Sequence, residues 1–380
     1  MRKCDIHVHS EGSDGVIGIT FTKLCGVKEC YSTPEDIYKL AIARGMDYVT
    51  ITDHNRLDKS VYLVEKIDRK KCFTGCEYTI QCNDTAHKVD VVCLDINEKQ
   101  HKDLMALRKI GVKEFAAYVK ENKIPHTLAH PAWPVEMNPK LTPEIVIGWI
   151  NLFNVIETIN GDIERANDIA QRLVKAKGYK MHDKNPEQIL GTTGGGDAHV
   201  LSGIARAYTV APHAKTKEGF LEAVLNGNVY AEGEYSNLQL LNDQIMEGVQ
   251  AHMRFEYQEI KRLGIRDYVK RNPIHLAYIA LVPILSPILP KAIARNLKTS
   301  IEERSYSLEK KCVDALLNKE FKEELMEIYT KITQRKKELE EDMKSPGFYL
   351  PPLNGLWATL IEKVREKWDF ANADYAPGND

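Results

Sequence analysis

Two histidines stand two residues apart near the start of the chain, in the stretch CDIHVHSEGSDG (residues 4–15). The residues around them alternate like a short β-strand, and alternate side chains of a strand point to the same face. His7 and His9 would therefore project together, as two imidazole ligands of one metal ion must. Two half-buried histidines without a metal would show the same spacing, so the pair alone leaves both interpretations open.

Further side chains that can bind metals recur along the first 200 residues, most of them where a predicted strand ends. In chain order they are Asp14, Asp53, His54, Glu77, His87, His126, His130, Asp197 and His199. Imidazole combined with carboxylate suits Zn²⁺, Mn²⁺ or Fe²⁺ better than Ca²⁺. These donors are too many for one ion, so the sequence predicts two or three divalent metal ions.

The segments that must position these side chains alternate between β-type and helical runs from residue 1 to about residue 236. The predicted strands are Cys4–Val8, Tyr48–Thr52, Phe73–Ile80, Lys88–Leu94, Pro125–Ala129, Val155–Ile159 and Ile189–Thr193. Such alternation predicts parallel strands with crossover helices, in a barrel or in an open sheet. In a (βα) barrel the carboxyl ends of the strands gather at one face, where active sites lie.

Three helical runs lie between the predicted strands: TPEDIYKLAIARG, QHKDLMALRKIGVKEFAAYVKENK and IERANDIAQRLVKAKG. In the first run, Thr33 is a suitable N-cap and Pro34 fits the first helical position. Gly45 fits the end of the same helix. These signals predict a capped helix between Thr33 and Gly45.

The pattern changes at about Asn237, beyond which strand signals disappear. LQLLNDQIMEGVQAHMRFEYQEIKRLG predicts a long amphipathic helix, and the charged stretch from Ser300 predicts two or three more. The sequence therefore predicts two domains, a barrel over residues 1–236 and an all-α extension over residues 237–380.

An apolar segment broken by prolines lies within that extension, at residues 273–298. It holds no Asp, Glu, Lys or Arg from Pro273 to Pro290, and basic residues flank it on both sides. A spanning helix needs about 20 apolar residues. The broken run therefore favours packing inside the extension, with contact to a membrane surface or a protein partner as the alternative.

Composition is that of an ordinary soluble protein. The 380 residues are 43% hydrophobic and 28% charged, with a net charge of −2. This balance does not indicate nucleic-acid binding, although an oligonucleotide is still a candidate substrate. The eight cysteines lack zinc-knuckle spacing and are expected to be small buried residues. Without a visible signal peptide, we expect a cytoplasmic protein, with peripheral association with the inner face of the membrane as the alternative.

The motifs occur in an order that is typical of one family. The chain resembles the PHP (polymerase and histidinol phosphatase) superfamily of metal-dependent phosphoesterases in HVHS followed by SDG, ITDHN, the Glu of GCEYTI, the His of AHKVDVV, the His-Pro of LAHP, and GGGDAH. Within residues 1–236 it is similar to a subgroup with a longer first loop, an FNVIETING segment and a C-terminal extension. Members of that subgroup sometimes occur fused to, or near, glycosyltransferases. The resemblance implies a distorted seven-stranded (βα) TIM-like barrel that binds up to three metals.

Matched motif by motif, the resemblance implies three metal sites that share ligands. The first would take His7, His9, Glu77 and Asp197, the second Glu77, His87 and His130, and the third Asp14, His54 and His199. All nine positions hold residues suited to a metal, which indicates an intact site.

Four more residues are candidates for catalysis or substrate binding. Asp53 precedes a ligand histidine and is expected to orient a neighbouring imidazole, with an ordinary hydrogen bond at the strand end as the alternative. His126 is a candidate general acid or phosphate contact, with a structural role as the alternative. Arg56 and Arg206 follow metal motifs and are candidates to hold a phosphate oxygen, with a surface ion pair as the alternative. The glycines at 194–196 allow the backbone to approach the site closely.

The predicted function is hydrolysis of a phosphate mono- or diester of a small metabolite or nucleotide by a metal-bridged hydroxide. One alternative is a protein phosphotyrosine phosphatase linked to polysaccharide synthesis. Another is a metal-stabilised interaction module that partners a glycosyltransferase. The insertion ITFTKLCGVKEC (residues 19–30) would lie beside the mouth of the barrel, so a substrate taken from shorter relatives does not transfer to this chain.

Overall fold

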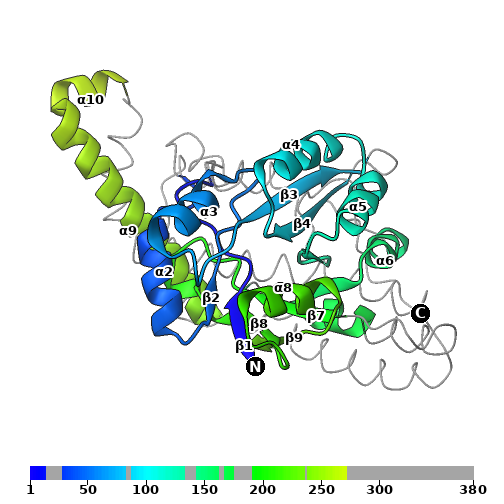
Figure 1. Ribbon diagram of the computed structural model, residues 1–380. Coiled ribbons are helices and arrows are strands. Elements are labelled where there is room, and N and C mark those ends of the chain that lie inside the picture. The colour runs from blue at the N-terminus through cyan, green and yellow to red at the C-terminus, as the bar shows by residue number, and fades with distance from the viewer. Residues whose placement is uncertain are drawn as a thin grey trace, which may run out of the picture.

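Strands and helices alternate along most of the chain in the computed structural model (Figure 1). The structure describes residues 1–13, 28–82, 87–132, 143–161, 167–174, 191–235 and 238–271. Asp14, the segment 273–298 and the helices predicted after Ser300 lie outside the described residues, as does the predicted domain boundary.

All seven predicted strands are present. They are β1 (Arg2–Asp5), β2 (Tyr48–Val49), β3 (Gly75–Gln81), β4 (Lys88–Leu94), β5 (His126–Leu128), β6 (Val155–Asn160) and β7 (Gly191–Gly195). The sequence did not predict two later strands, β8 (Ala207–Ala211) and β9 (Tyr230–Gly233). Both are short, and no residue of β9 is buried, so neither gives a clear pattern of alternating buried and exposed residues.

The strands form two sheets, in the orders β2–β1–β8–β9 and β3–β4–β5–β6–β7. Isolated parallel bridges connect them, between Val8 and Ala198 and between His54 and Glu77. The described residues thus form a mixed α/β fold of two connected sheets, and among them the predicted barrel is not seen as one closed sheet.

The prediction of parallel strands throughout was wrong. β3 pairs antiparallel with β4, as do β4 with β5, β1 with β8 and β8 with β9. Only β1–β2, β5–β6 and β6–β7 are parallel among the paired strands described. The connection between β3 and β4 spans residues 82–87, which is too short for the crossover that parallel strands require.

Helix α2 (Pro34–Ala43) has the predicted caps. The side chain of Thr33 accepts a hydrogen bond from the backbone N–H of Asp36 at 3.2 Å. Gly45 beyond its end has a φ of +85°, which glycine adopts without steric cost. The second predicted helical run is divided into α4 (Glu98–Leu107) and α5 (Val112–Glu121), with Gly111 at the N-cap position of α5.

The other helices are α3 (Asp58–Tyr62), α6 (Pro143–Leu152), α8 (Lys217–Leu225), α9 (Leu238–Leu263) and α10 (Ile265–Arg271), with a helical segment at 167–174. Helix α9 confirms the long helix predicted from LQLLNDQIMEG and the residues that follow. None of the helices in the described ranges combines the length and apolar character needed to cross a membrane.

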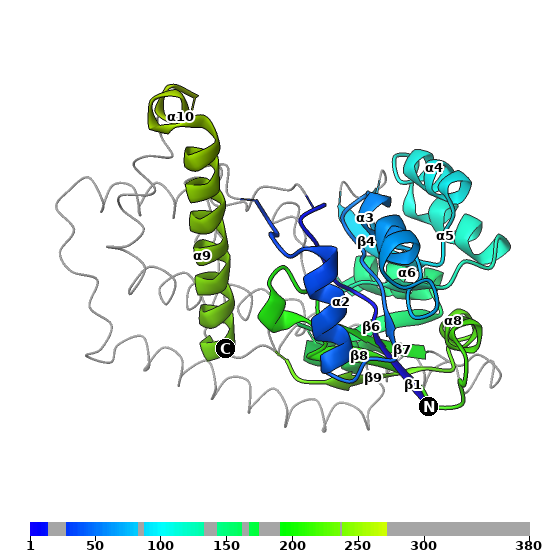
Figure 2. The same ribbon diagram turned by 60° about the vertical axis from the view of Figure 1, so that its left-hand side comes forward.

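Three apolar clusters hold the sheets and helices together. The largest packs β3 and β4 against α4, α5 and α6 through residues such as Tyr78, Phe115 and Trp149. A second joins β1 and β2 to α8, and a third joins α2 to the β1–β2 region. Helix α9 lies on the α2 side of the sheets, away from α4, α5 and α6 (Figures 1 and 2).

The cysteines that the structure describes are all buried, as predicted, and none of them forms a disulfide. They are Cys4, Cys30, Cys72, Cys76, Cys82 and Cys93. Each therefore contributes to packing rather than to a disulfide.

Gly194 in β7 lies against the backbone of β8 in the other sheet, so no side chain fits at this position. A Cβ at this position would lie 2.6 Å from Tyr208 O and 2.9 Å from Tyr208 N in β8. Gly194→Ala should therefore lower the free energy of unfolding by about 1–3 kcal/mol, measured by urea unfolding followed by circular dichroism. Gly148 in α6 is the matched control, because a Cβ there meets nothing within 4 Å. Gly148→Ala should raise stability by up to about 1 kcal/mol, and equal effects of the two changes would contradict the packing described.

Candidate metal centre

The predicted ligands meet where the two sheets are joined. Val8 of one bridge lies between His7 and His9, and its partner Ala198 lies between Asp197 and His199. The other bridge pairs two predicted ligands directly, His54 and Glu77. Residues His7, His9, His54, Glu77, His130, Asp197 and His199 all belong to groups that could hold a metal ion. The backbone pairing that connects the sheets therefore also assembles the site.

The four residues expected at the first site lie together. The Nε2 atoms of His7 and His9 are 3.3 Å apart. His7 Nε2 is 3.2 Å from Glu77 Oε1 and 3.4 Å from Asp197 Oδ1. His9 Nε2 is 3.3 Å from Glu77 Oε2 and 3.0 Å from Asp197 Oδ1. Two imidazole nitrogens and two carboxylates thus converge on one small volume.

Glu77 is the centre of the cluster and is completely buried. Besides His7 and His9, its carboxylate is 2.8 Å from His54 Nδ1 and 3.2 Å from His130 Nε2. Burial alone would raise the pKa of Glu77, but the charges of His7 and His54 lower it well below its ordinary value. Burial would likewise lower the pKa of His7, whereas Asp197 and Glu77 raise it well above the ordinary value. Positive charge is therefore favoured next to the buried carboxylates, and a divalent cation bound by these residues would supply it.

A second group contains an aspartate that the sequence analysis missed. Glu77, His130 and Asp90 of β4 have ligand atoms within 4.8 Å of one another. Burial, followed by the charge of Glu77, raises the pKa of Asp90 to about 6. The visible signal was an acidic residue inside the apolar strand KVDVVCL.

His87, predicted for this second group, lies elsewhere. Its ring meets that of Trp149 edge-on at 6.2 Å between centroids, beside the cluster that packs against the helices. His87 and Asp90 are three residues apart, so an extended chain directs them to opposite faces. The structure therefore places Asp90, and not His87, with Glu77 and His130.

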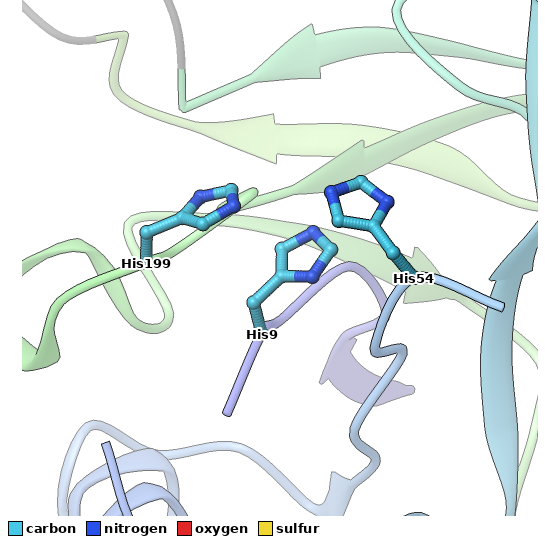
Figure 3. Close-up of side chains that lie close together, drawn as sticks. All are labelled: His9, His54 and His199. Carbon is cyan, nitrogen blue, oxygen red and sulfur yellow. The ribbon is translucent and has the colours of Figure 1, made fainter. Parts of the chain in front are cut away.

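The third group is rich in imidazole. Figure 3 shows the rings of His9, His54 and His199 turned toward one another, and their ligand nitrogens lie within 4.8 Å of one another. The carboxylate of Glu29, which the sequence analysis also missed, lies 3.4 Å from His54 Nε2 and 3.3 Å from His199 Nε2. Glu29 belongs to the insertion at residues 19–30, where no motif marks it. Asp14, which was expected here, lies outside the described residues.

Several buried ligand atoms have no hydrogen-bond partner in the described part of the chain. They are Glu77 Oε2, Asp90 Oδ1, His54 Nδ1, His130 Nδ1 and His199 Nε2. Buried polar atoms without partners cost free energy. Lone pairs that converge from several such donors suit a divalent cation, so the residues present fit the metals that the sequence implies.

Glu157 in β6 supports the cluster and was not predicted. Its Oε1 lies 3.1 Å from His7 Nδ1, and its Oε2 accepts hydrogen bonds from the backbone N–H of His130 at 2.9 Å and from Asn160 Nδ2 at 2.8 Å. With Nδ1 engaged, the Nε2 of His7 faces Glu77 and Asp197. The signal was again an acidic residue in a buried strand, within FNVIETING.

Asp53 acts on the cluster through a serine. Its carboxylate accepts hydrogen bonds from Ser10 N at 2.7 Å, Ser10 Oγ at 2.6 Å and Ser13 Oγ at 3.0 Å. Ser13 Oγ is in turn 3.0 Å from His9 Nδ1. Asp53 therefore fixes the loop that holds His9, and its influence on that imidazole is indirect.

His126 lies in the packed core. Its Nδ1 is 2.7 Å from Ile124 O, and its ring meets that of Phe153 edge-on at 5.6 Å. Burial lowers the pKa of His126 to about 4, so the imidazole is neutral at physiological pH. These contacts favour the structural alternative over a catalytic role.

The two arginines proposed for phosphate binding both have protein partners. Arg56 pairs with Asp58 at 3.0 Å and has a side chain that is 43% exposed. Arg206 donates to Ser202 O at 2.9 Å and lies 3.8 Å from Glu234 Oε2. Both arrangements match the ion-pair alternative, and phosphate binding by either residue is still a prediction.

The three glycines at 194–196 lie against the site, as their sequence suggested. A Cβ on Gly195 would lie 2.4 Å from the Cβ of His7 and 2.5 Å from Glu157 Oε1. The N–H of Gly196 donates to the buried carboxylate of Asp5 at 2.8 Å. Close approach of the backbone thus brings Asp197 and His199 to the histidines that follow β1.

Two family descriptions match consecutive parts of the chain. The PHP domain matches residues 22–181, and the PHP-associated family matches residues 187–229. Together they span more than half of the chain. The chain belongs to the PHP superfamily.

Solved structures that resemble this PHP chain are distant. PsfC from Pseudomonas syringae PB-5123 is 13% identical, with a TM-score of 0.42, 66% of this chain covered and 98% of that chain. A Bifidobacterium adolescentis ATCC 15703 protein, provisionally assigned as a metal-dependent phosphoesterase, is 17% identical, with a TM-score of 0.35 and coverage of 59% and 96%. An amidohydrolase from Chromobacterium violaceum with bound sulfate is 15% identical, with a TM-score of 0.37 and coverage of 58% and 96%. No curated protein matched the sequence.

Membership of the PHP superfamily and the clustered His, Glu and Asp side chains together support a metal-dependent hydrolase. The number and identity of the metals, and the bond that is hydrolysed, belong to the proposal below.

His126 should make the protein less stable in acid. Its pKa falls from the ordinary 6.5 to about 4 on folding, so below pH 6.5 the unfolded chain binds a proton that the native protein does not. Between pH 6.5 and 4, wild type should lose roughly 3 kcal/mol more unfolding free energy than His126→Asn, which keeps a donor toward Ile124 O. Urea unfolding with a chelator present measures this difference. His213→Asn, at an exposed position, is the control, and parallel curves for wild type and His126→Asn would contradict the prediction.

Asp90 should matter more than His87 for metal binding. Removing the carboxylate in Asp90→Asn should weaken one Mn²⁺ site by about 10-fold or more, while His87→Gln should leave metal affinity close to wild type. Calorimetric titration of Mn²⁺ into metal-stripped protein measures both. A larger loss of Mn²⁺ affinity in His87→Gln than in Asp90→Asn would contradict this prediction and support the ligand set that the family resemblance implied.

Proposed function

We propose that this protein is a metal-dependent phosphoesterase that hydrolyses phosphate mono- or diesters of a small metabolite or nucleotide. The observation that carries the proposal is the convergence of four imidazoles on the completely buried carboxylate of Glu77. A buried carboxylate destabilises the core unless positive charge lies next to it, and divalent cations bound by these residues would supply that charge. The PHP superfamily membership supports the same activity.

Two or three divalent ions are the cofactors we propose, chosen from manganese, iron and zinc. Glu77, Asp90 and His130 form an oxygen-rich group, which suits Mn²⁺ or Fe²⁺. His9, His54 and His199 form a nitrogen-rich group, which suits Zn²⁺ or Fe²⁺. The carboxylate of Glu77 has two oxygens and belongs to two of the groups that could hold a metal ion, so it would keep two ions close enough to act on one phosphate group.

The ions would supply an activated water at neutral pH and would neutralise charge that builds on the phosphoryl oxygens. The residues of the chain would fix where this happens. Glu157 holds His7, and Ser13 holds His9, each through the Nδ1 atom of the ring. Because these contacts are buried, the opposite nitrogens stay aimed at the cluster while a substrate binds and leaves.

The cluster is closed on one side and open on the other. The side chains of His7, His9 and Glu77 are 0% exposed, whereas those of His54 and His199 are 30% and 29% exposed. A phosphate ester would therefore approach from the side of His54 and His199. A small phosphorylated molecule, a nucleotide or the end of an oligonucleotide is compatible with this direction of entry.

The activity can be tested with generic esters before any natural substrate is known. Purified protein supplied with Mn²⁺, Fe²⁺ or Zn²⁺ should hydrolyse p-nitrophenyl phosphate or bis-p-nitrophenyl phosphate. The His7→Ala, His9→Ala double variant should lose at least about 100-fold in rate and should bind fewer metals by elemental analysis, because two ligands are removed. His213→Ala, an exposed histidine, is the matched control.

Absence of turnover with every metal, in protein that binds its metals fully, would reject the phosphoesterase proposal. If turnover is found, a panel of phosphorylated metabolites, nucleotides and phosphotyrosine peptides would show which ester is preferred.

A further inference from the structure

Glu29 differs from the other acidic residues of the cluster because the insertion, and not a strand of the sheets, carries it. Its Oε1 atom is almost equally far from two imidazole nitrogens, 3.4 Å from His54 Nε2 and 3.3 Å from His199 Nε2. These are the two partly exposed histidines of the cluster. Glu29 therefore stands at the open side of the site, where a substrate would enter.

We propose that Glu29 is a ligand of the divalent ion held by His54 and His199, and that helix α9 fixes the segment that carries it. This inference rests on the metal centre of the proposed function. Glu29 of the insertion would then bind the metal itself, and α9 would contribute by holding Glu29 in position.

The donor set around Glu29 fits a metal better than it fits a simple ion pair. His199 Nε2 lies 3.3 Å from the carboxylate of Glu29. The two groups are not aligned for a hydrogen bond, and this nitrogen has no hydrogen-bond partner among the described residues. His9 brings a third imidazole to the same group, stacked at 4.3 Å on the ring of His199. Because His9 Nε2 also faces Glu77 and Asp197, the donors that belong to this ion alone are His54, His199 and Glu29. Three protein ligands and one open position are what catalytic Zn²⁺ sites use.

Lys28 and Tyr31 lie on either side of Glu29 in the sequence, and both contact α9. The backbone N–H of Lys28 donates to the hydroxyl of Tyr31 at 2.9 Å, and that hydroxyl lies 2.7 Å from His252 Nδ1. The ammonium of Lys28 lies 5.0 Å from the centre of the Phe255 ring, and the ring of Tyr31 lies 5.8 Å from the same ring. The short segment that carries Glu29 is thus tethered on both sides to one face of α9.

The tether is itself anchored inside the helical region. His252 is 0% exposed and lies 3.6 Å from Glu256, one turn further along α9. Glu256 accepts a hydrogen bond from the hydroxyl of Tyr268 in α10. Tyr31 therefore meets a fixed imidazole, and a shift of α9 would be passed to Glu29 through that hydroxyl and through the contacts with Phe255.

Metal titration of the full-length protein tests the ligand role of Glu29. Zn²⁺ or Mn²⁺ is titrated calorimetrically into metal-stripped Glu29→Gln, and bound metal is counted by elemental analysis. One site should weaken by about 10-fold or more, with the other sites as in wild type. Glu232→Gln is the matched control, because Glu232 also forms an ion pair, with Lys3, away from the cluster.

An unchanged metal affinity and count in Glu29→Gln would overturn the proposal. Tighter binding of inorganic phosphate by that variant would then show that the carboxylate occupies the place of an anionic substrate. Loss of the same site in Asp14→Asn but not in Glu29→Gln would also overturn it. None of these readouts needs ester hydrolysis, so an inactive protein that still lost a metal in Glu29→Gln would separate this inference from the proposed function.

Tyr31→Phe tests the part played by α9. It keeps the ring that packs on Phe255 but removes the hydroxyl that joins Lys28 to His252. As a positioning residue, Tyr31 should weaken the same site by about 10-fold when changed, with unfolding in chelator unaltered. Tyr38→Phe, which removes a hydroxyl bonded to Asp68 away from the cluster, is the control. Wild-type metal affinity in Tyr31→Phe would show that α9 does not position Glu29.

Discussion

The buried carboxylate of Glu77 is the constraint on which the rest of the structure depends. A lone carboxylate with no exposed surface would be very costly, so each segment around it brings a compensating group. His7 follows β1, His54 follows β2 and His130 follows β5, and all three approach the same two oxygens. Because His54 and Glu77 also form a backbone bridge between the sheets, the electrostatic centre and the structural junction coincide. Loss of one would disturb the other.

The strand periodicity of two explains what the sequence could reveal. In both H-V-H and D-A-H the middle residue takes part in the Val8–Ala198 bridge, so the flanking ligands project to one side. Spacing alone therefore predicted that His7 projects with His9 and Asp197 with His199, whereas the hypothesis of a metal site needed all the motifs together. The same rule, applied to HKVD, directs His87 and Asp90 to opposite faces, but it does not say which of them faces the cluster. That information comes from the structure, which groups Asp90 with Glu77 and His130.

Strand directions and the roles of Glu157 and Glu29 depend on contacts between segments that are distant in the sequence, and no local sequence pattern specifies them. Alternation of strands and helices predicted the seven strands correctly but several of their directions wrongly, because pairing is decided between segments far apart in the chain. The antiparallel β3–β4 pair was foreseeable only from the short connection at 82–87. Glu157 and Glu29 carry no motif, and their roles arise from where β6 and the insertion come to rest. Acidic residues that interrupt apolar strands are the one signal that would have singled out Glu157 and Asp90 in advance.

The side chains of the cluster differ in exposure, and each set lies against a different part of the chain. His7, His9 and Glu77 are sealed by β-strands and by the support of Glu157 and Ser13, so their geometry is fixed by the core. His54 and His199 are partly exposed and lie beside Glu29, which belongs to the described segment at residues 28–31 that contacts α9. The strands therefore position the inner ligands, whereas the outer histidines lie beside Glu29, whose neighbours Lys28 and Tyr31 contact α9. A site built in this way would keep its inner ligands fixed while the segment at its open side differs between relatives, as loops do more readily than strands.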